Sequence, residues 1–247
     1  TVANPIPDQN ATEDVAFNFQ FTANTFNDID VGDELTYSAQ LVGGGELPVW
    51  LIFDGLGSER RFSGTPSNAD TGLIQIEVTA TDNSAASVST TFELNVAAVN
   101  DAPEITAPLI IVVDEDVPES LTGISFTDPD AGSSLIEVRF TVDSGTLSGV
   151  SGSGVTVSGT PIALVLEGTI SDINDFISAG DLTFTTDLNS TADVTLNINI
   201  DDNGHTGTGG ALTDQATVTI EVTAVNDAPV NSVPGPQQTD QDVALVF

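Results

Sequence analysis

The chain has 247 residues and a formal net charge of −34 at pH 7, because 3 Lys and Arg oppose 37 Asp and Glu. A surface this acidic repels nucleic acids and anionic membranes, and the absence of Cys excludes disulfides and thiolate zinc sites. The single His, His205, lies in a Gly-rich stretch and is the only general base at neutral pH, which argues against an enzyme. No apolar run approaches the roughly 20 residues of a membrane helix, so we expect no direct membrane insertion.

Short runs of alternating apolar and polar residues recur along the chain, separated by clusters of Gly, Asn, Asp, Ser and Pro. Each run predicts a strand with one buried face. In chain order, clear examples are Glu34–Ala39, Leu73–Val78, Thr91–Val96 and Thr217–Val222. Regular short strands with turn signals between them predict an all-β sandwich or barrel. One short helix is expected near Ser171–Ile177, with Ser171 or Asp172 as its cap.

The chain is internally repetitive. The linker sequence Val-Asn-Asp-Ala-Pro at Val99–Pro103 returns at Val225–Pro229, and the strand patterns that precede the two copies also match. The repetition divides the chain into a first repeat at 1–101, a second at 102–227 and the truncated start of a third at 228–247. We therefore expect the chain to be a segment of a longer repetitive protein.

Acidic residues occupy matching places in the repeats. The pattern Phe-x-Asp-x-Asp-x-Gly occurs at 26–32 and 126–132. Glu-Asp-Val occurs at 13–15 and 115–117, and returns as Gln-Asp-Val at 241–243. This repetition indicates a shared site rather than isolated turns.

Other aspartates need no special explanation, because Asp favours turns. We read Asp54, Asp70, Asp143 and Asp187 in this way.

The paired carboxylates of the Asp-x-Asp loops predict a bound cation. Two like charges about 4 Å apart repel by about 4 kcal/mol at an effective dielectric of 20, and the chain has almost no basic residues to offset this. Calcium takes 6–8 oxygen ligands from carboxylates, amides and backbone carbonyls, which are the groups that these loops supply. Adaptation to high salt is the alternative, but it would spread acids over exposed strand faces, which here carry Thr, Ser and Asn.

Together, these motifs resemble the cadherin-like repeats of large bacterial surface and secreted proteins. The first repeat is similar to the dystroglycan-type cadherin-like group at Leu47–Asp54 and Phe62–Pro66. The second is similar to repeats of bacterial adhesins and repeat toxins at Gly168–Asn174, Asp201–Gly204 and Gly209–Thr213. The resemblance implies tandem immunoglobulin/cadherin-like Greek-key β-sandwiches, seven strands to a repeat, with Ca²⁺ at the junctions.

The resemblance also implies the calcium ligands. At the junction of the two repeats they are Glu13, Asn100, Asp101, Asp128, Asp130 and either Asp201 or Asp202, of which strand phase favours Asp202. At the two ends of the pair, incomplete sites are expected from Asn4, Asp28, Asp30 and Asp82, and from Glu115, Asn226 and Asp227. A further acidic motif of animal cadherins has no clear counterpart here, so fewer ions are expected at each junction.

The leading hypothesis is a rigid extender of a large bacterial adhesin, with neighbouring repeats of the same chain as partners. The alternative is a module that binds polysaccharide or a cell-surface protein. Only 6% of residues are aromatic, and Trp50 lies in an apolar run where core packing is expected. Weak carboxylate sites fill at about 10⁻⁴–10⁻³ M calcium, so an extracellular or bacterial cell-surface location is expected.

Overall fold

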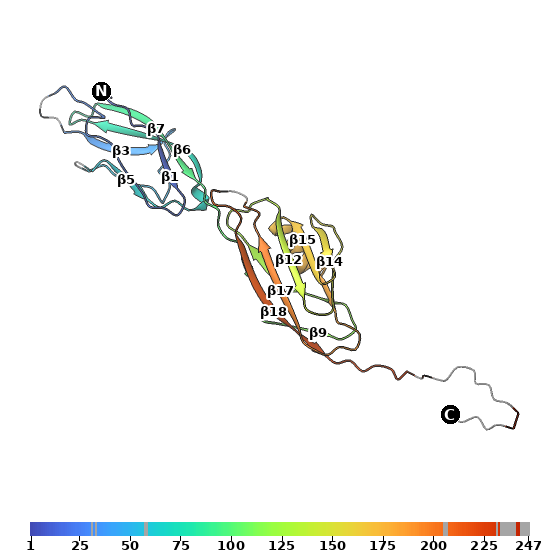
Figure 1. Cartoon of the computed structure of the whole chain (residues 1–247). Coiled ribbons are helices and arrows are strands. Elements are labelled where there is room, and N and C mark those ends of the chain that lie inside the picture. The colour runs from blue at the N-terminus through green and yellow to red at the C-terminus, as the bar shows by residue number, and fades with distance from the viewer. Residues whose placement is uncertain are drawn as a thin grey trace.

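The computed structural model describes residues 1–30, 32, 34–56, 59–204, 207–230, 232 and 241–242. His205 and most of the expected third repeat lie outside the described residues. Two groups of strands follow one another along the chain and lie end to end, joined by a linker at residues 98–103 (Figure 1). We call them unit one and unit two.

The described residues of unit one form a two-sheet sandwich of seven strands. A four-stranded sheet has the order β1-β7-β6-β3, and a three-stranded sheet has the order β2-β5-β4. The elements are β1 Gln9–Thr12, β2 Phe17–Gln20, β3 Thr36–Leu41, β4 Ile52–Asp54, β5 Arg61–Gly64, the 3-10 helix η1 Asn68–Asp70, β6 Gly72–Thr81 and β7 Ser87–Ala97. The seven strands are the number expected for a repeat.

Unit two is larger, and the expectation of seven strands is wrong for it. The described residues form a six-stranded sheet β14-β15-β12-β17-β18-β9, a three-stranded sheet β10-β16-β13 and the pair β11-β8. The added hairpin β14–β15 continues the large sheet past β12. The strands are β8 Glu104–Thr106, β9 Ile110–Asp114, β10 Glu119–Ser120, β11 Ser125–Thr127, β12 Ile136–Val142, β13 Thr146–Ser148, β14 Thr156–Thr160, β15 Ala163–Gly168, β16 Thr183–Thr185, β17 Val194–Asp201 and β18 Thr213–Thr223.

Strand alternation builds a separate core in each unit, as the sequence predicts. In β18, Val218, Ile220 and Val222 are buried and their neighbours in the strand are exposed. The buried residues of unit one form one hydrophobic cluster and those of unit two form another. In both units the first strand of the large sheet runs parallel to the last, β1 beside β7 and β9 beside β18. The all-β immunoglobulin/cadherin-like sandwich class is therefore confirmed.

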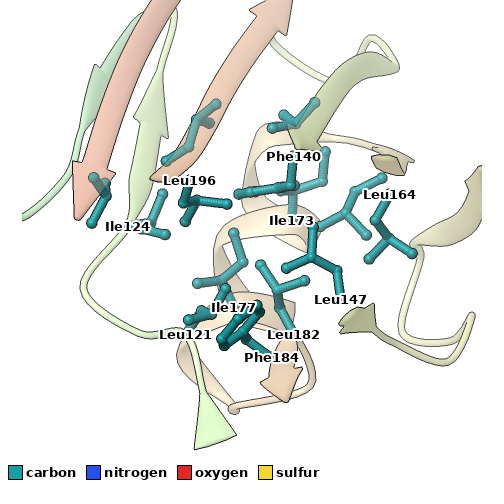
Figure 2. Packing of buried hydrophobic residues seen from close by; sticks show 14 of the residues in the cluster. Leu121, Ile124, Phe140, Leu147, Leu164, Ile173, Ile177, Leu182, Phe184 and Leu196 are labelled. Carbon is teal, nitrogen blue, oxygen red and sulfur yellow. The ribbon is translucent and has the colours of Figure 1, made fainter. Parts of the chain in front are cut away.

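The predicted helix of unit two is present as α1, Ile170–Ser178. Its cap differs from the prediction, because the helix begins earlier: Thr169 is the N-cap, and its Oγ1 accepts a hydrogen bond from the Asp172 amide at 3.1 Å. Ile173 and Ile177 point into the core of unit two (Figure 2). Among the described residues, no helix is long and apolar enough to cross a bilayer.

Trp50 packs in the core of unit one, as the sequence predicts. It is partly buried, lies against the hydrophobic cluster and meets Phe17 edge-on at 6.4 Å between ring centroids. Asp54, the last residue of β4, and Asp70 in η1 close local turns, because they accept the amides of Leu56 and Ser67. Asp143 lies in a bend after β12 and accepts the more distant Thr195 amide.

Candidate metal centre at the junction of the two units

The turn after β1 brings the first carboxylates to the linker. The Glu13 amide donates to the Ala97 carbonyl at 3.0 Å, and Glu13 Oε2 accepts from the Val99 amide at 3.0 Å. Asp14 adopts a left-handed backbone with φ 56°, and its amide donates to the Pro66 carbonyl at 2.9 Å. One carboxylate oxygen each from Glu13, Asp14 and Asp101 lie within 4.8 Å of one another. This cluster could hold a metal ion.

The Asp-x-Asp loop of unit two supplies the second group of oxygens. Asp128 Oδ1 accepts from the amides of Asp130 and Ala131, both at 3.0 Å, so the loop is a tight turn closed by its own side chain. Gly132 ends this turn with φ 51°, a left-handed backbone that glycine adopts without strain. Asp130 Oδ2 accepts from the Asp101 amide at 3.0 Å. The loop is therefore fixed directly to the linker.

Asp202, directly after β17, is a further carboxylate beside the linker. Asp202 is 1% exposed, and its Oδ1 accepts from the amides of Gly204 and Leu212 at 2.7 and 2.8 Å. Its Oδ2 accepts from Asn100 Nδ2 at 2.5 Å. Asp201 lies on the outer face at the end of β17 and accepts from the Asn203 amide instead. The strand phase thus places Asp202, and not Asp201, beside the linker.

A glycine-rich loop of unit two also binds the linker along its backbone. The Thr208 amide donates to the Ala98 carbonyl at 3.0 Å, and the Asn100 amide donates to the Thr208 carbonyl at 3.1 Å. Gly207 lies so close that a Cβ there would meet the Asn100 nitrogen at 2.4 Å. We call residues 207–210 the linker clasp.

A contact outside the linker joins the two units as well. The Asn68 side chain, in η1 of unit one, donates from Nδ2 to the Pro129 carbonyl in the Asp-x-Asp loop of unit two. Pro66, two residues earlier, holds the Asp14 amide. The loop that includes η1 therefore contacts both groups of acidic residues.

Several buried oxygens of this junction have no hydrogen-bond donor in the part of the chain that the structure describes. They are Oε1 of Glu13, Oδ1 of Asn100 and Oδ2 of Asp128. A buried carboxylate or amide oxygen that lacks a donor costs free energy unless a cation compensates it. Hard oxygen ligands of this kind fit Ca²⁺, and they do not fit a soft metal. The residues present therefore fit Ca²⁺, the ion expected from the sequence.

The electrostatics lead to the same conclusion. Burial, followed by the neighbouring Asp130 carboxylate, raises the pKa of Asp128 to about 6. Partial desolvation, with smaller contributions from the charges of Asp130 and Asp14, raises the pKa of Asp101. Without a cation, the junction therefore disfavours the ionised forms of Asp128 and Asp101.

The two ends of the pair carry related groups. At one end, Asp28 and Asp82 line the same small cavity of about 100 Å³, and the Asp30 amide donates to Asp28 Oδ1 at 3.0 Å. Asp82 Oδ1 accepts two backbone amides at 2.8 Å, from Ser84 and Ala86, just as Asp202 does. This end repeats the local geometry of the junction.

At the other end, Glu115 repeats the role of Glu13. Its Oε1 accepts from the Val225 amide at 2.9 Å. Asp116 has φ 63°, like Asp14, and Asn189 in its hydrogen-bonding orientation donates to both Asp116 and Asp227. Asn226 is exposed, and its side chain donates to the Asp227 carbonyl.

Asp14 and Asp116 are not among the ligands expected from the sequence. In each copy of the Glu-Asp-Val repeat, only the Glu is expected to be a ligand. Asp14 and Asp116 share a left-handed backbone that the sequence does not show directly, and Asp242 has the same conformation with φ 66°. The recurrence of Asp at this position in three repeats is the sequence feature that could have identified them.

One family model matches unit one. Residues 1–97 match the family model described as "Putative Ig domain" (He_PIG). The curated protein sequences gave no match.

The chain is similar to several solved structures at low identity. Human mucin-like protocadherin EC1-2 is 15% identical, with 90% of this chain and 98% of that chain covered and a TM-score of 0.47. The protocadherin gammaB7 EC3-6 cis-dimer is 18% identical, with 90% and 46% covered and a TM-score of 0.44. The endo-fucoidan hydrolase MfFcnA4 from glycoside hydrolase family 107 is 20% identical, with 91% and 28% covered and a TM-score of 0.36. The chain thus spans less than half of the gammaB7 chain.

Proposed function

We propose that this chain is a non-catalytic, calcium-binding repeat module of an extracellular adhesin, in which Ca²⁺ at the junction holds unit one and unit two as a stiff rod. The observation that carries the proposal is the junction itself. Carboxylates of unit one and the linker lie within 4.8 Å of one another there, and Asp130 and Asp202 of unit two accept hydrogen bonds from the linker. Three buried oxygens of the junction have no hydrogen-bond donor among the described residues.

The ligands would come from three parts of the chain. Glu13 and Asp14 belong to unit one, Asn100 and Asp101 to the linker, and the remaining ligands to unit two: Asp128, Asp130 and Asp202. A bound ion supplies positive charge that offsets the mutual repulsion of these groups. Because one charge would be shared across three segments, relative motion of the units would separate ligands from it. At about 100 times its dissociation constant, such an ion adds about 2.7 kcal/mol of stability.

The linker clasp and the contact from Asn68 limit motion before any ion binds. The continuous chain and these contacts already join the two units. The main effect of the ion would therefore be to fix the angle between them. We therefore propose that the hydrogen bonds hold the two units together at the linker, and that the ion makes this junction stiff.

The proposal extends to location and partners. Cadherin-like and immunoglobulin-like domains are typical of extracellular proteins, where millimolar calcium fills weak sites. Neighbouring repeats of the same chain are the proposed partners at the junctions. A polysaccharide or a cell-surface protein is the proposed target of the parent adhesin.

The test combines calcium binding with shape. Isothermal titration of calcium and small-angle scattering with and without calcium would be measured on the wild type and on Glu13→Gln/Asp101→Asn. We expect the wild type to bind calcium and to scatter as a narrower, longer particle when loaded, and the variant to lose both responses. Glu46→Gln/Asp175→Asn is the matched control, because it removes the same charge from two exposed acids outside the clusters. A wild type that binds no calcium, or whose scattering does not change, would contradict the proposal.

A further inference from the structure

Helix α1 reaches the Asp-x-Asp loop of unit two through one side chain. Asn174 accepts the Phe126 amide on Oδ1 and donates from Nδ2 to the Phe126 carbonyl, both at 2.9 Å. An amide that meets both backbone groups of one residue imitates the pairing of a neighbouring strand. Phe126 lies two residues before Asp128, so this clamp acts at the entrance to the loop.

The helix that carries Asn174 is fixed in the core of unit two. Asn174 lies between Ile173 and Phe176 of α1, and both of these side chains are buried, at 0% and 2% exposure. Figure 2 shows Ile173 and Ile177 directed into the core among Leu121, Phe140 and Leu196. The Phe126 ring is itself buried at 1% and packs edge-on against Phe140. Both partners of the clamp are thus anchored in the same core.

The space around the loop supports the same conclusion. Asn174 and Asp128 line one shallow hollow of about 470 Å³ between α1 and the loop, together with Phe126, Pro129 and Ile170. This hollow leaves one side of the Asp128–Gly132 turn without packed atoms. The clamp therefore restrains the loop on a side where packing does not.

Unit one reaches the same motif without this device. Its Asp-x-Asp loop follows Phe26, whose backbone is paired by an isolated bridge to Val2, and no α-helix is present among the described residues of that unit. The inserted helix thus gives the second loop a support that the first lacks. The strand leading to the second loop also pairs with β8, and the Asn174 side chain is the contact that the helix adds to this pairing.

We propose that Asn174 is a positioning residue of the calcium site, through which the inserted helix fixes Asp128 for the ion. The inference rests on the proposed function for its calcium readout. A ligand held in place before binding loses less conformational freedom on binding, so the clamp raises calcium affinity without touching the ion. Removing an outer support of a metal ligand lowers metal affinity by about tenfold or more.

The experiment is a calcium titration of Asn174→Ala beside Asp175→Ala. Both changes remove a polar side chain from α1 and raise its helix propensity, but Asp175 is exposed and outside the hollow. We expect about tenfold weaker calcium binding in Asn174→Ala and an affinity within twofold of the wild type in Asp175→Ala. An Asn174→Ala variant that binds like the wild type would overturn the inference and leave the proposed function standing, whereas a wild type that binds no calcium would contradict the proposed function itself.

A calcium-free readout covers the case in which Asn174→Ala does not fold. Amide hydrogen exchange of the wild type in calcium-free buffer should show Phe126 protected like the core amides of β12. Rapid exchange at Phe126 would show that the clamp does not hold the loop, and would overturn the inference without any variant.

Discussion

The Asp-x-Asp loops of the two units share one local geometry and lie in different surroundings. In both, the second Asp amide donates to the first Asp carboxylate at 3.0 Å. In both units, a later aspartate, Asp82 or Asp202, accepts two backbone amides on one carboxylate oxygen. In unit two, however, Asp130 and Asp202 are 8% and 1% exposed, whereas in unit one Asp30 is exposed and Asp82 is half-buried.

The difference shows what each level of structure contributes. The motif alone folds into a turn that displays two carboxylates. Burial comes from segments that are distant in the sequence: the linker, the linker clasp and the loop that includes η1. This burial leaves oxygens without donors among the described residues, and it raises the pKa of Asp128 to about 6. Both effects favour a cation. Four perturbations test this contrast.

The largest expected difference is between Asp202→Ala and Asp82→Ala. Asp202→Ala leaves two amides without an acceptor in a buried site, and Asn100 Nδ2 keeps only the Gly210 carbonyl, so the change should cost unit two about 3 kcal/mol. Asp82→Ala leaves two amides that water can reach, so unit one should lose about 1 kcal/mol. Hydrogen exchange at the core amides of β17 and β6 reports each unit separately. Equal losses in the two units would show that burial at the junction adds nothing.

A smaller effect is expected when the linker clasp is disturbed. A Cβ on Gly207 would meet backbone atoms of Asn100 and Val99 at 2.4 and 2.5 Å, so Gly207→Ala should shift the clasp and cost about 1–3 kcal/mol. Gly45→Ala is the control, because its Cβ would make ordinary contacts with Leu41 at 3.6 and 3.7 Å. Loss of exchange protection at the Asn100 amide would be the readout. Full protection in Gly207→Ala would mean that the clasp does not hold the linker.

The smallest expected effect is a pH dependence that calcium reverses. The pKa of Asp128 is about 6 in the folded protein, above its ordinary value of 3.8. Folding therefore disfavours the ionised form: this group favours folding most below about pH 4, and that advantage is lost as the pH rises through 6. In calcium-free buffer the melting temperature should fall between pH 5 and pH 7, and it should fall less in Asp128→Asn.

Calcium affinity should change in the opposite direction over the same range, because a cation binds the ionised carboxylate. Titrations at pH 5, 6 and 7 would measure this. A calcium affinity that does not depend on pH would show that Asp128 is not a ligand of the ion.

Much of this arrangement is predictable from the sequence, because local rules govern it. Alternation in Thr217–Val222 predicts a strand, and the phase of Ile198 and Ile200 places Asp202 toward the interior. The repeated Asn-Asp linker and Asp-x-Asp loops predict which acids gather at the junction. Their roles as ligands remain predictions.

The rest depends on contacts between distant segments that no local pattern encodes. The linker clasp pairs residue 208 with residues 98–100. In the sequence, its glycines cannot be told from those of an ordinary loop. The Asn174 clamp spans 48 residues. Asp14 joins the cluster because of a single left-handed residue, and the hairpin β14–β15 arises from a length difference that periodicity alone did not resolve.

The most direct test of the central claim is thermal unfolding with and without calcium, on the wild type and on Asp128→Asn/Asp130→Asn. With calcium at about 100 times its dissociation constant, one site adds about 2.7 kcal/mol. For a chain of this size that corresponds to a rise of roughly 5–10 °C in the wild type, since about 1 kcal/mol shifts the midpoint by 2–4 °C. We expect the rise to disappear or shrink strongly in the double variant. A wild type that melts at the same temperature with and without calcium would contradict a calcium-stabilised junction.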